Sequence, residues 1–392
     1  MNLRKIKASG IYGTDDIHIV NGKFSWYCKN KIRIKFGGRE HLKNFKKYVQ
    51  CIEEVFMRSL VYKGPNELKI EETPKPQLKS GEVLIKVKYC GICGSDITIW
   101  EGKHPRAKSG VILGHEFTGE IVEIDELNSN LSIGDKVVVE PLIHCHSCDY
   151  CKEGKYNLCN KIGLYGIDEN GAFAEYIKVL SGKVIPLSLS TDLKKMTLVE
   201  PLAVVINAVS KSNIKLGDTI TVLGAGTIGL LVAQVVRDAG AAKIIVSEIN
   251  ELRLKRAKKM GFIVINPQRE DLEKEVKKIS SKGADLVFDA AGYPSVVDNA
   301  FKIVKKGGEI NIVAIHTQES LISLQKLAYS ELTIKGTFIY TWEDFRRAKI
   351  MLENDLIDSK SIITHIFPFE DSIKGFEMMK EGFDGIKILV EI

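Results

Sequence analysis

The chain has 392 residues, of which 44% are hydrophobic and 27% are charged. These values exclude disordered and collagen-like classes and are typical of a globular protein long enough for two domains with separate cores. The net charge of +6 is uneven: residues 1–56 hold 12 Lys+Arg against 5 Asp+Glu, whereas the remainder holds 44 against 45. Because the body of the chain is neutral, nucleic-acid binding is not expected.

The basic excess lies in an N-terminal extension, residues 1–56. Its pattern predicts a strand pair around Phe24, Trp26, Ile32 and Ile34, followed by a basic helix from Glu40 to Phe56. A solvated appendage and a surface for a polyanion or a partner are both compatible with it. The first twenty residues contain no continuous apolar run, so no secretory signal is expected and a reducing, cytoplasmic compartment is predicted.

Short strands dominate the next part of the chain, residues 57–205. The stretch from Met57 to Glu72 alternates around a turn, and Val83, Ile85 and Val87 continue the period of two. Clusters of Gly, Pro and Asp interrupt these strands. The pattern predicts a barrel-like β domain with long functional loops.

From residue 206 to 342, apolar strands alternate with amphipathic helices. This alternation predicts a doubly wound parallel sheet. The expected strands are 219–223, 243–248, 263–265, 285–289, 309–315 and 332–338. Residues 343–392 then show helical patterns and a closing strand, I-K-I-L-V-E-I. The uncharged run from Thr219 to Val236 is long enough to suggest a membrane span, but a glycine pattern interrupts it, so a buried strand and helix are predicted instead.

That glycine pattern is G-A-G-T-I-G, residues 224–229. It follows a predicted strand and opens a helix, and Glu248 ends the next strand, which is the arrangement of a dinucleotide-binding turn. Gly224 permits the turn, Gly226 lets the backbone approach a pyrophosphate, and Gly229 lets helix and strand pack closely. Thr227 and Ile228 complete the turn, and Glu248 is expected to bind ribose hydroxyls and favour NAD over NADP. Arg253, one turn into the next helix, is expected to moderate the rejection of NADP.

Two cysteine-containing patterns indicate further chemistry. C-H-S-C-D-Y-C-K-E-G-K-Y-N-L-C, residues 145–159, places four cysteines in one short segment, for which a disulfide, a redox centre and a metal site are the alternatives. C-G-I-C-G-S-D, G-H-E and V-E-P-L supply Cys93, His115 and Glu200. A thiolate, an imidazole and a carboxylate are the ligand set of a catalytic zinc with one open position. Taken singly, each also fits a buried structural residue.

These motifs, in this order and at these separations, resemble the zinc-dependent medium-chain dehydrogenases, and most closely their butanediol, sorbitol and threonine dehydrogenase branch. The resemblance covers residues 57–392. It implies a split, GroES-like catalytic domain (57–205 and 343–392) that encloses an inserted Rossmann domain (206–342).

The resemblance also implies two zinc ions and the cofactor NAD. Cys145, Cys148, Cys151 and Cys159 match the four thiolates of the structural zinc site, which suits a closed tetrahedral centre. Cys93 and His115 match catalytic zinc ligands. Glu116 and Glu200 are both candidates for the remaining carboxylate, and the sequence leaves the choice open.

For the reaction, Ser95 matches the hydroxyl that takes the alcohol proton, and Asp96 matches the carboxylate that orients His115. The histidine that many relatives place three residues after this serine is Thr98 here. The proton relay therefore stays open, with a water chain, His104 or a shorter path as alternatives.

The sequence thus predicts a dehydrogenase of a secondary alcohol or vicinal diol. Within its branch the expected order of substrates is 2,3-butanediol, a polyol such as sorbitol, and threonine. Tyr340 and Trp342 are expected to narrow the substrate pocket or to pack at a hinge. The rivals are a metal-free quinone or enone reductase and a non-enzymatic zinc- and nucleotide-binding protein. A homo-oligomer, either a dimer or a tetramer, is expected. Binding to a membrane is not expected.

Overall fold

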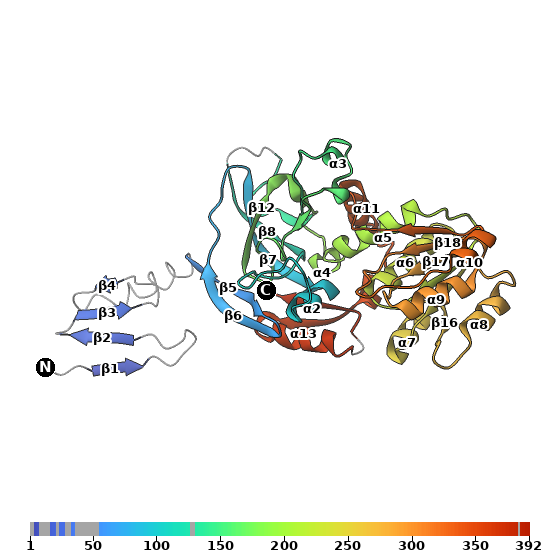
Figure 1. Cartoon of the computed structure of the whole chain (residues 1–392). Helices are drawn as coiled ribbons and strands as arrows, with labels where there is room; N and C mark the ends of the chain where they lie inside the picture. The colour runs from blue at the N-terminus through green and yellow to red at the C-terminus, as the bar shows by residue number, and fades with distance from the viewer. Residues whose placement is uncertain are drawn as a thin grey trace. The chain divides into compact units, whose positions relative to one another are not determined.

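The computed structural model describes residues 55–125, 130–382 and 385–392, together with the backbone of four strands in the first 35 residues. The chain divides into two compact units (Figure 1). One comprises Met1–Met57 and Thr73–Lys75, and the other comprises Arg58–Glu72 and Pro76–Ile392.

The four N-terminal strands form an antiparallel sheet in the order β1-β2-β3-β4. Their bounds are β1 Arg4–Lys7, β2 Asp16–Val20, β3 Lys23–Tyr27 and β4 Arg33–Lys35. The predicted strand pair corresponds to β3 and β4, with Trp26 opposite Ile34. The predicted helix lies outside the described residues except for its last two, of which Phe56 begins β5.

The β-rich domain contains a seven-stranded sheet, in the order β13-β9-β8-β7-β21-β20, with β12 also paired to β7, and two two-stranded sheets, β5-β6 and β10-β11. The long strand β7 is central because β8, β12 and the C-terminal strand β21 all pair with it antiparallel. Its inward side chains, among them Val83, Ile85 and Val87, are fully buried. The strands of this domain are β5 Phe56–Gly64, β6 Glu67–Pro74, β7 Glu82–Ile92, β8 Glu116–Ile124, β9 Lys136–Val139, β10 Leu142–Ile143, β11 Gly163–Leu164, β12 Tyr176–Leu180, β13 Val184–Pro186, β20 Ile363–Pro368 and β21 Lys387–Glu391.

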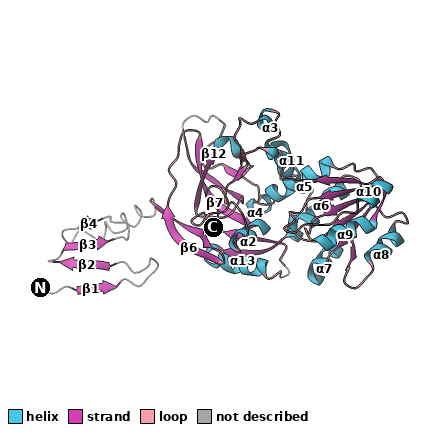
Figure 2. Ribbon diagram, in the orientation of Figure 1, coloured by secondary structure: helices cyan, strands magenta, loops and turns pink. Residues whose placement is uncertain are grey.

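The second sheet has six parallel strands in the order β16-β15-β14-β17-β18-β19. Successive side chains of β14 face opposite layers: Val222 packs in one core cluster with α5 and α6, whereas Leu223 packs in another with α8 and α9. Figure 2 shows the strands of this sheet flanked by helices. The strands are β14 Thr219–Leu223, β15 Lys243–Ser247, β16 Ile263–Ile265, β17 Ala284–Asp289, β18 Val304–Ile312 and β19 Thr333–Gly336. The predicted doubly wound sheet is confirmed.

One boundary differs clearly from the prediction. Strand β18 begins at Val304, ahead of the predicted start at Glu309. The intervening K-K-G-G has no apolar alternation, and the register with β17 shifts there between Ala284 and Leu286. A strand that continues through such an irregularity does not show the period of two.

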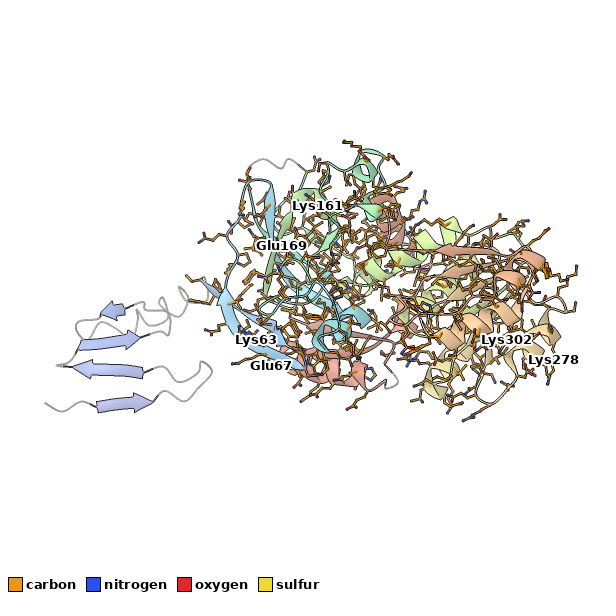
Figure 3. All side chains as sticks on the ribbon, viewed as in Figure 1. Lys63, Glu67, Lys161, Glu169, Lys278 and Lys302 are labelled. Atoms are coloured by element: carbon orange, nitrogen blue, oxygen red, sulfur yellow. The ribbon has the colours of Figure 1, made fainter. Side chains whose placement is uncertain are left out.

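Some helices cover the two faces of the parallel sheet, and others lie in the connections between strands of the β domain. They are α2 Gly94–Trp100, α3 Asp149–Lys152, α4 Leu193–Met196, α5 Val199–Lys211, α6 Thr227–Asp238, α7 Glu251–Lys259, α8 Leu272–Ile279, α9 Pro294–Ile303, α10 Leu324–Tyr329, α11 Trp342–Glu353, α12 Ser359–Ile362 and α13 Ser372–Lys380. Lys278 on α8 and Lys302 on α9, labelled in Figure 3, are exposed. Within the described part of the chain, no helix is long and apolar enough to cross a membrane.

Candidate active site

A cluster of three potential metal ligands lies where α2 and β8 begin. Cys93 is the N-cap of α2, and His115 and Glu116 stand at the start of β8. Their ligand atoms all lie within 4.8 Å of one another. Gly114, with φ of 97°, turns the chain immediately before His115, and an added Cβ there would lie 2.7 Å from Phe173 and 2.8 Å from Cys90. The tight turn before β8 therefore needs glycine.

Asp96 lies beside two members of this cluster. Its Oδ2 accepts a hydrogen bond of 2.8 Å from the backbone N–H of Cys93, and its Oδ1 lies 3.7 Å from Nδ1 of His115. Burial lowers the pKa of His115, but Asp96, Cys93 and Glu200 together outweigh burial, and the pKa is raised well above its usual value. Asp96 is fully buried and lies beside the imidazole, where a carboxylate that orients a metal-binding histidine is found in metal sites.

Glu116 is held by Lys387, a residue of the last strand. The Lys387 ammonium donates to both carboxylate oxygens of Glu116, at 2.8 and 2.6 Å, and to the carbonyl of Ile92 at 3.1 Å. Both side chains are almost completely buried. An added Cβ at Gly91 would lie 2.3 Å from Oε2 of Glu116, so glycine at position 91 leaves room for this carboxylate.

Glu200 lies in the first turn of α5 and is 8% exposed. Among the described residues it is not a member of the three-residue cluster. Burial raises the pKa of Glu200 to about 7, Glu116 adds to this rise, and His115 and Tyr340 oppose it. The structure therefore brings Glu116, rather than Glu200, into the cluster with Cys93 and His115, and leaves Glu200 as a second carboxylate beside it.

The predicted proton-transfer residues occupy different environments. The Ser95 hydroxyl is buried and has no hydrogen-bond partner within the described residues. The Thr98 hydroxyl donates a hydrogen bond of 3.1 Å to the carbonyl of Gly94, one turn earlier in α2. His104 accepts a hydrogen bond of 3.3 Å from the backbone N–H of Arg106.

The four-cysteine segment also folds into one cluster. The ligand atoms of Cys145, Cys148, Cys151 and Cys159 lie within 4.8 Å of one another. Backbone N–H groups point at these sulfur atoms: Cys148 donates to Cys145, and Lys161 donates to Cys159, both at 3.4 Å. Hydrogen bonds from Ser147 and from the backbone of Cys148 lower the pKa of Cys145 to about 5. Such donors favour thiolates, the form of cysteine that binds a metal.

The glycine-rich turn is tight and leads directly into α6. Gly224 has φ of 105°, and a Cβ at Gly229 would lie 1.9 Å from the carbonyl oxygen of Gly224. Gly226 caps the N-terminus of α6, where N–H groups attract phosphates. Thr227 donates its hydroxyl to the carbonyl of Ile386 at 2.6 Å, and Ile228 packs on the adjoining core.

Glu248 follows β15 at the carboxyl edge of the parallel sheet. One of its oxygens accepts from the N–H of Ala225 at 2.8 Å, and the other accepts from Ile249 and Asn250 at 2.8 and 2.9 Å. These bonds hold the carboxylate against the glycine-rich turn. Arg253 donates from Nη2 to the carbonyl of Gly385 at 3.1 Å.

Lys387 was not identified from the sequence. Its signal is a single charged residue inside the closing apolar strand, where the neighbours Ile388, Leu389 and Val390 are all fully buried. A lysine buried to 2% exposure needs a partner, but the sequence does not show that the partner is Glu116, because the two meet only when β21 joins the sheet.

A β-rich domain with a thiolate–imidazole–carboxylate cluster, joined to a parallel sheet with a dinucleotide turn, defines a metal-dependent dehydrogenase. Two family models match the chain: Alcohol dehydrogenase GroES-like domain over residues 79–189 and Zinc-binding dehydrogenase over residues 227–354. The chain is 33% identical to a sorbitol dehydrogenase of Bacillus subtilis over 82% of its length and 93% of the relative's. It is 34% identical to an L-threonine 3-dehydrogenase of the same organism, over 82% of this chain and 94% of the relative.

Solved structures agree. The 2R,3R-butanediol dehydrogenase of Bacillus subtilis superimposes with a TM-score of 0.80 at 31% identity, over 86% of this chain and 99% of that one. A zinc-binding dehydrogenase of Sinorhizobium meliloti, bound to NADP, superimposes with a TM-score of 0.81 at 28% identity, over 86% of this chain and 99% of that one. The chain belongs to the zinc-dependent medium-chain dehydrogenases. It is an NAD(P)-dependent alcohol or polyol dehydrogenase, so the metal-free reductase and the non-enzymatic alternative are excluded.

Proposed function

We propose that the chain oxidises a small vicinal diol of the 2,3-butanediol type with NAD. The observation that supports this substrate is the second carboxylate: Glu200 lies beside the Cys93–His115–Glu116 cluster without belonging to it. A carboxylate next to the reacting alcohol accepts a hydrogen bond from a second hydroxyl of the substrate. A simple alcohol leaves that acceptor without a substrate partner, and such polar contacts discriminate more strongly than an added methylene.

Two zinc ions fit the donor atoms. Four thiolates within 4.8 Å of one another suit a closed structural site, and Cys93, His115 and one glutamate suit an open one. Zinc at the open site supplies a Lewis acid that lowers the pKa of the bound alcohol. In this proposal Asp96, 3.7 Å from the imidazole, orients His115, the Ser95 hydroxyl, which has no partner among the described residues, accepts the alcohol proton, and Lys387 holds Glu116 within the cluster.

NAD is the proposed cofactor because Glu248 presents a fixed carboxylate at the end of β15. The carboxylate accepts hydrogen bonds from ribose hydroxyls and repels a 2′-phosphate. The N-terminus of α6 receives the pyrophosphate, and bound nicotinamide supplies the hydride acceptor. A homo-oligomer remains a prediction from the family resemblance.

A single kinetic screen tests substrate and cofactor together. The absorbance of reduced nicotinamide is followed with 2,3-butanediol, sorbitol, threonine and 2-butanol, each with NAD and with NADP. We expect kcat/KM for 2,3-butanediol with NAD to exceed that for 2-butanol by about tenfold or more. A preference for 2-butanol removes the diol proposal, a preference for threonine assigns the chain to the other branch, and equal use of NADP overturns the role of Glu248. The L-threonine 3-dehydrogenase relative makes threonine the second candidate.

A further inference from the structure

The turn that leads into α11 contains a strained residue. Ile339 has φ of 49°, in the left-handed region that β-branched residues rarely occupy. Such a conformation persists only where the surrounding structure holds it in place, and it often marks a functional position. Its immediate neighbour in the chain is Tyr340, which is fully buried.

Two buried asparagines hold this turn. Asn207 donates from Nδ2 to the carbonyl of Ile339 at 2.7 Å and to that of Phe338 at 3.4 Å. Asn157 donates to the same Phe338 carbonyl at 3.2 Å. Asn207 belongs to α5, the helix whose first turn carries Glu200. The helix that carries Glu200 therefore also fixes the backbone that carries Tyr340.

The Tyr340 side chain lies near enough to Glu200 for each group to shift the pKa of the other. It lowers the pKa of Glu200, while burial, Glu200, Glu140 and Glu116 raise the pKa of Tyr340 well above its usual value. The phenol therefore stays protonated and acts as a donor. Among the described residues, however, the hydroxyl has no partner at ordinary hydrogen-bond geometry. A buried hydroxyl without a partner is costly and requires an explanation.

We propose that Tyr340 is a positioning residue for Glu200. In the enzyme–substrate complex its hydroxyl donates to one oxygen of Glu200 and so turns the other oxygen toward the second hydroxyl of the diol. Ile339, Asn157 and Asn207 set the position of the donor. This inference rests on the proposed diol function, because only a diol supplies the second donor that an oriented Glu200 accepts.

The test compares Tyr340→Phe with the unmodified enzyme on 2,3-butanediol and 2-butanol. Loss of the hydroxyl should lower kcat/KM for the diol by about tenfold, the effect of one hydrogen bond to a charged group, and should change the value for 2-butanol by less than about twofold. Tyr329→Phe, the same exchange at a residue that is 78% exposed, is the matched control and should change neither. Calorimetric titration of the zinc-loaded enzyme with 2,3-butanediol, without cofactor, should show a weakening similar to that in kcat/KM.

A second variant tests the turn itself. Asn207→Ala removes both hydrogen bonds from α5 and should reproduce the selective loss for the diol, with thermal melting as the check on folding. If the unmodified enzyme prefers 2-butanol, the proposed function fails whatever Tyr340 does. If it prefers the diol and Tyr340→Phe keeps that preference, or loses activity equally on both substrates, the positioning role is wrong.

Discussion

At the scale of single residues, the β domain is unusual in the charge that it buries. Glu116 pairs with Lys387, and Glu140 pairs with Lys183, with all four side chains at 10% exposure or less. Buried ion pairs add little net stability, but removal of one partner leaves an uncompensated charge and costs about 3–5 kcal/mol. Lys387 is the more informative of the two lysines because its partner belongs to the candidate metal cluster.

His144 extends the second pair and predicts a dependence of stability on pH. Its Nδ1 lies 3.1 Å from Nζ of Lys183, and its ring stacks on Tyr156 with centroids 5.1 Å apart. Burial, then Lys183 and His146, lower the pKa of His144 from 6.5 to about 4. The unfolded chain therefore binds a proton at a pH where the native chain does not. This contribution to stability is present above pH 6.5 and is lost as pH falls toward about 4.

The test is His144→Asn, whose amide oxygen still accepts from Lys183 but does not titrate. The free energy of unfolding of the natural chain should fall by up to about 3 kcal/mol between neutral pH and pH 4 through this residue, and the variant should show a correspondingly smaller fall. Denaturant titrations at several pH values measure the difference. Parallel pH profiles for the two proteins would remove His144 as the source.

Residues within short motifs were predictable, and residues that act across the fold were not. Cys93, His115 and the four cysteines stand in local patterns whose spacing already indicates metal chemistry. Lys387 reaches Glu116 only because β21 pairs with β7. Tyr340 was expected at the pocket or at a hinge, but the strain at Ile339 and the two asparagine contacts depend on tertiary structure. No local periodicity reports such contacts.

At the scale of elements, strand type was easier to predict than strand length. The segments T-I-T-V-L and I-V-I match β14 and β16 residue for residue, because continuous apolar runs bounded by polar residues are typical of parallel strands. The start of β18 was missed because the first half of this strand is polar and shows no apolar alternation. The four-cysteine segment contains only one turn of α3 and a 3-10 helix, Tyr156–Leu158.

This scarcity of regular structure predicts different effects for the two cysteine clusters. With only two short helical turns, the segment 145–159 is expected to depend on its metal for stability. Cys145→Ser should therefore cost about 2 kcal/mol or more, roughly 4–8 °C in Tm, and one zinc ion. Cys93→Ser should keep the fold and lower kcat by about a hundredfold or more, since metal catalysis contributes several kcal/mol to the barrier.

Metal analysis and thermal melting of the unmodified enzyme and both variants distinguish these roles. Two zinc ions per chain are expected in the unmodified enzyme. One zinc ion or fewer in fully folded protein contradicts the two-site proposal. If both variants lost activity alone, with Tm unchanged, the division into a structural and a catalytic site would be wrong.

At the scale of the whole molecule, charge and structure divide the chain at nearly the same place. The basic excess ends at residue 56, after which Lys+Arg and Asp+Glu number 44 and 45, and the first compact unit runs to Met57 with the addition of Thr73–Lys75. The two curated relatives match 82% of the chain. From the sequence pattern we propose that the catalytic domain comprises residues 57–205 and 343–392. The Rossmann domain would then comprise residues 206–342.

A chain that begins at Met57 should therefore be a self-sufficient enzyme. The candidate metal clusters and the glycine-rich turn all lie in the second unit. Removal of residues 1–56 should leave two zinc ions bound and kcat/KM within about twofold, with a change in unfolding free energy of at most about 1 kcal/mol. Zinc analysis, kinetics and thermal melting of the shortened chain beside the full chain provide the measurement. Because Thr73–Lys75 groups with the first unit, a small loss of stability near β6 is compatible with this prediction. Failure to fold or to bind zinc would instead show that the extension is part of the catalytic core.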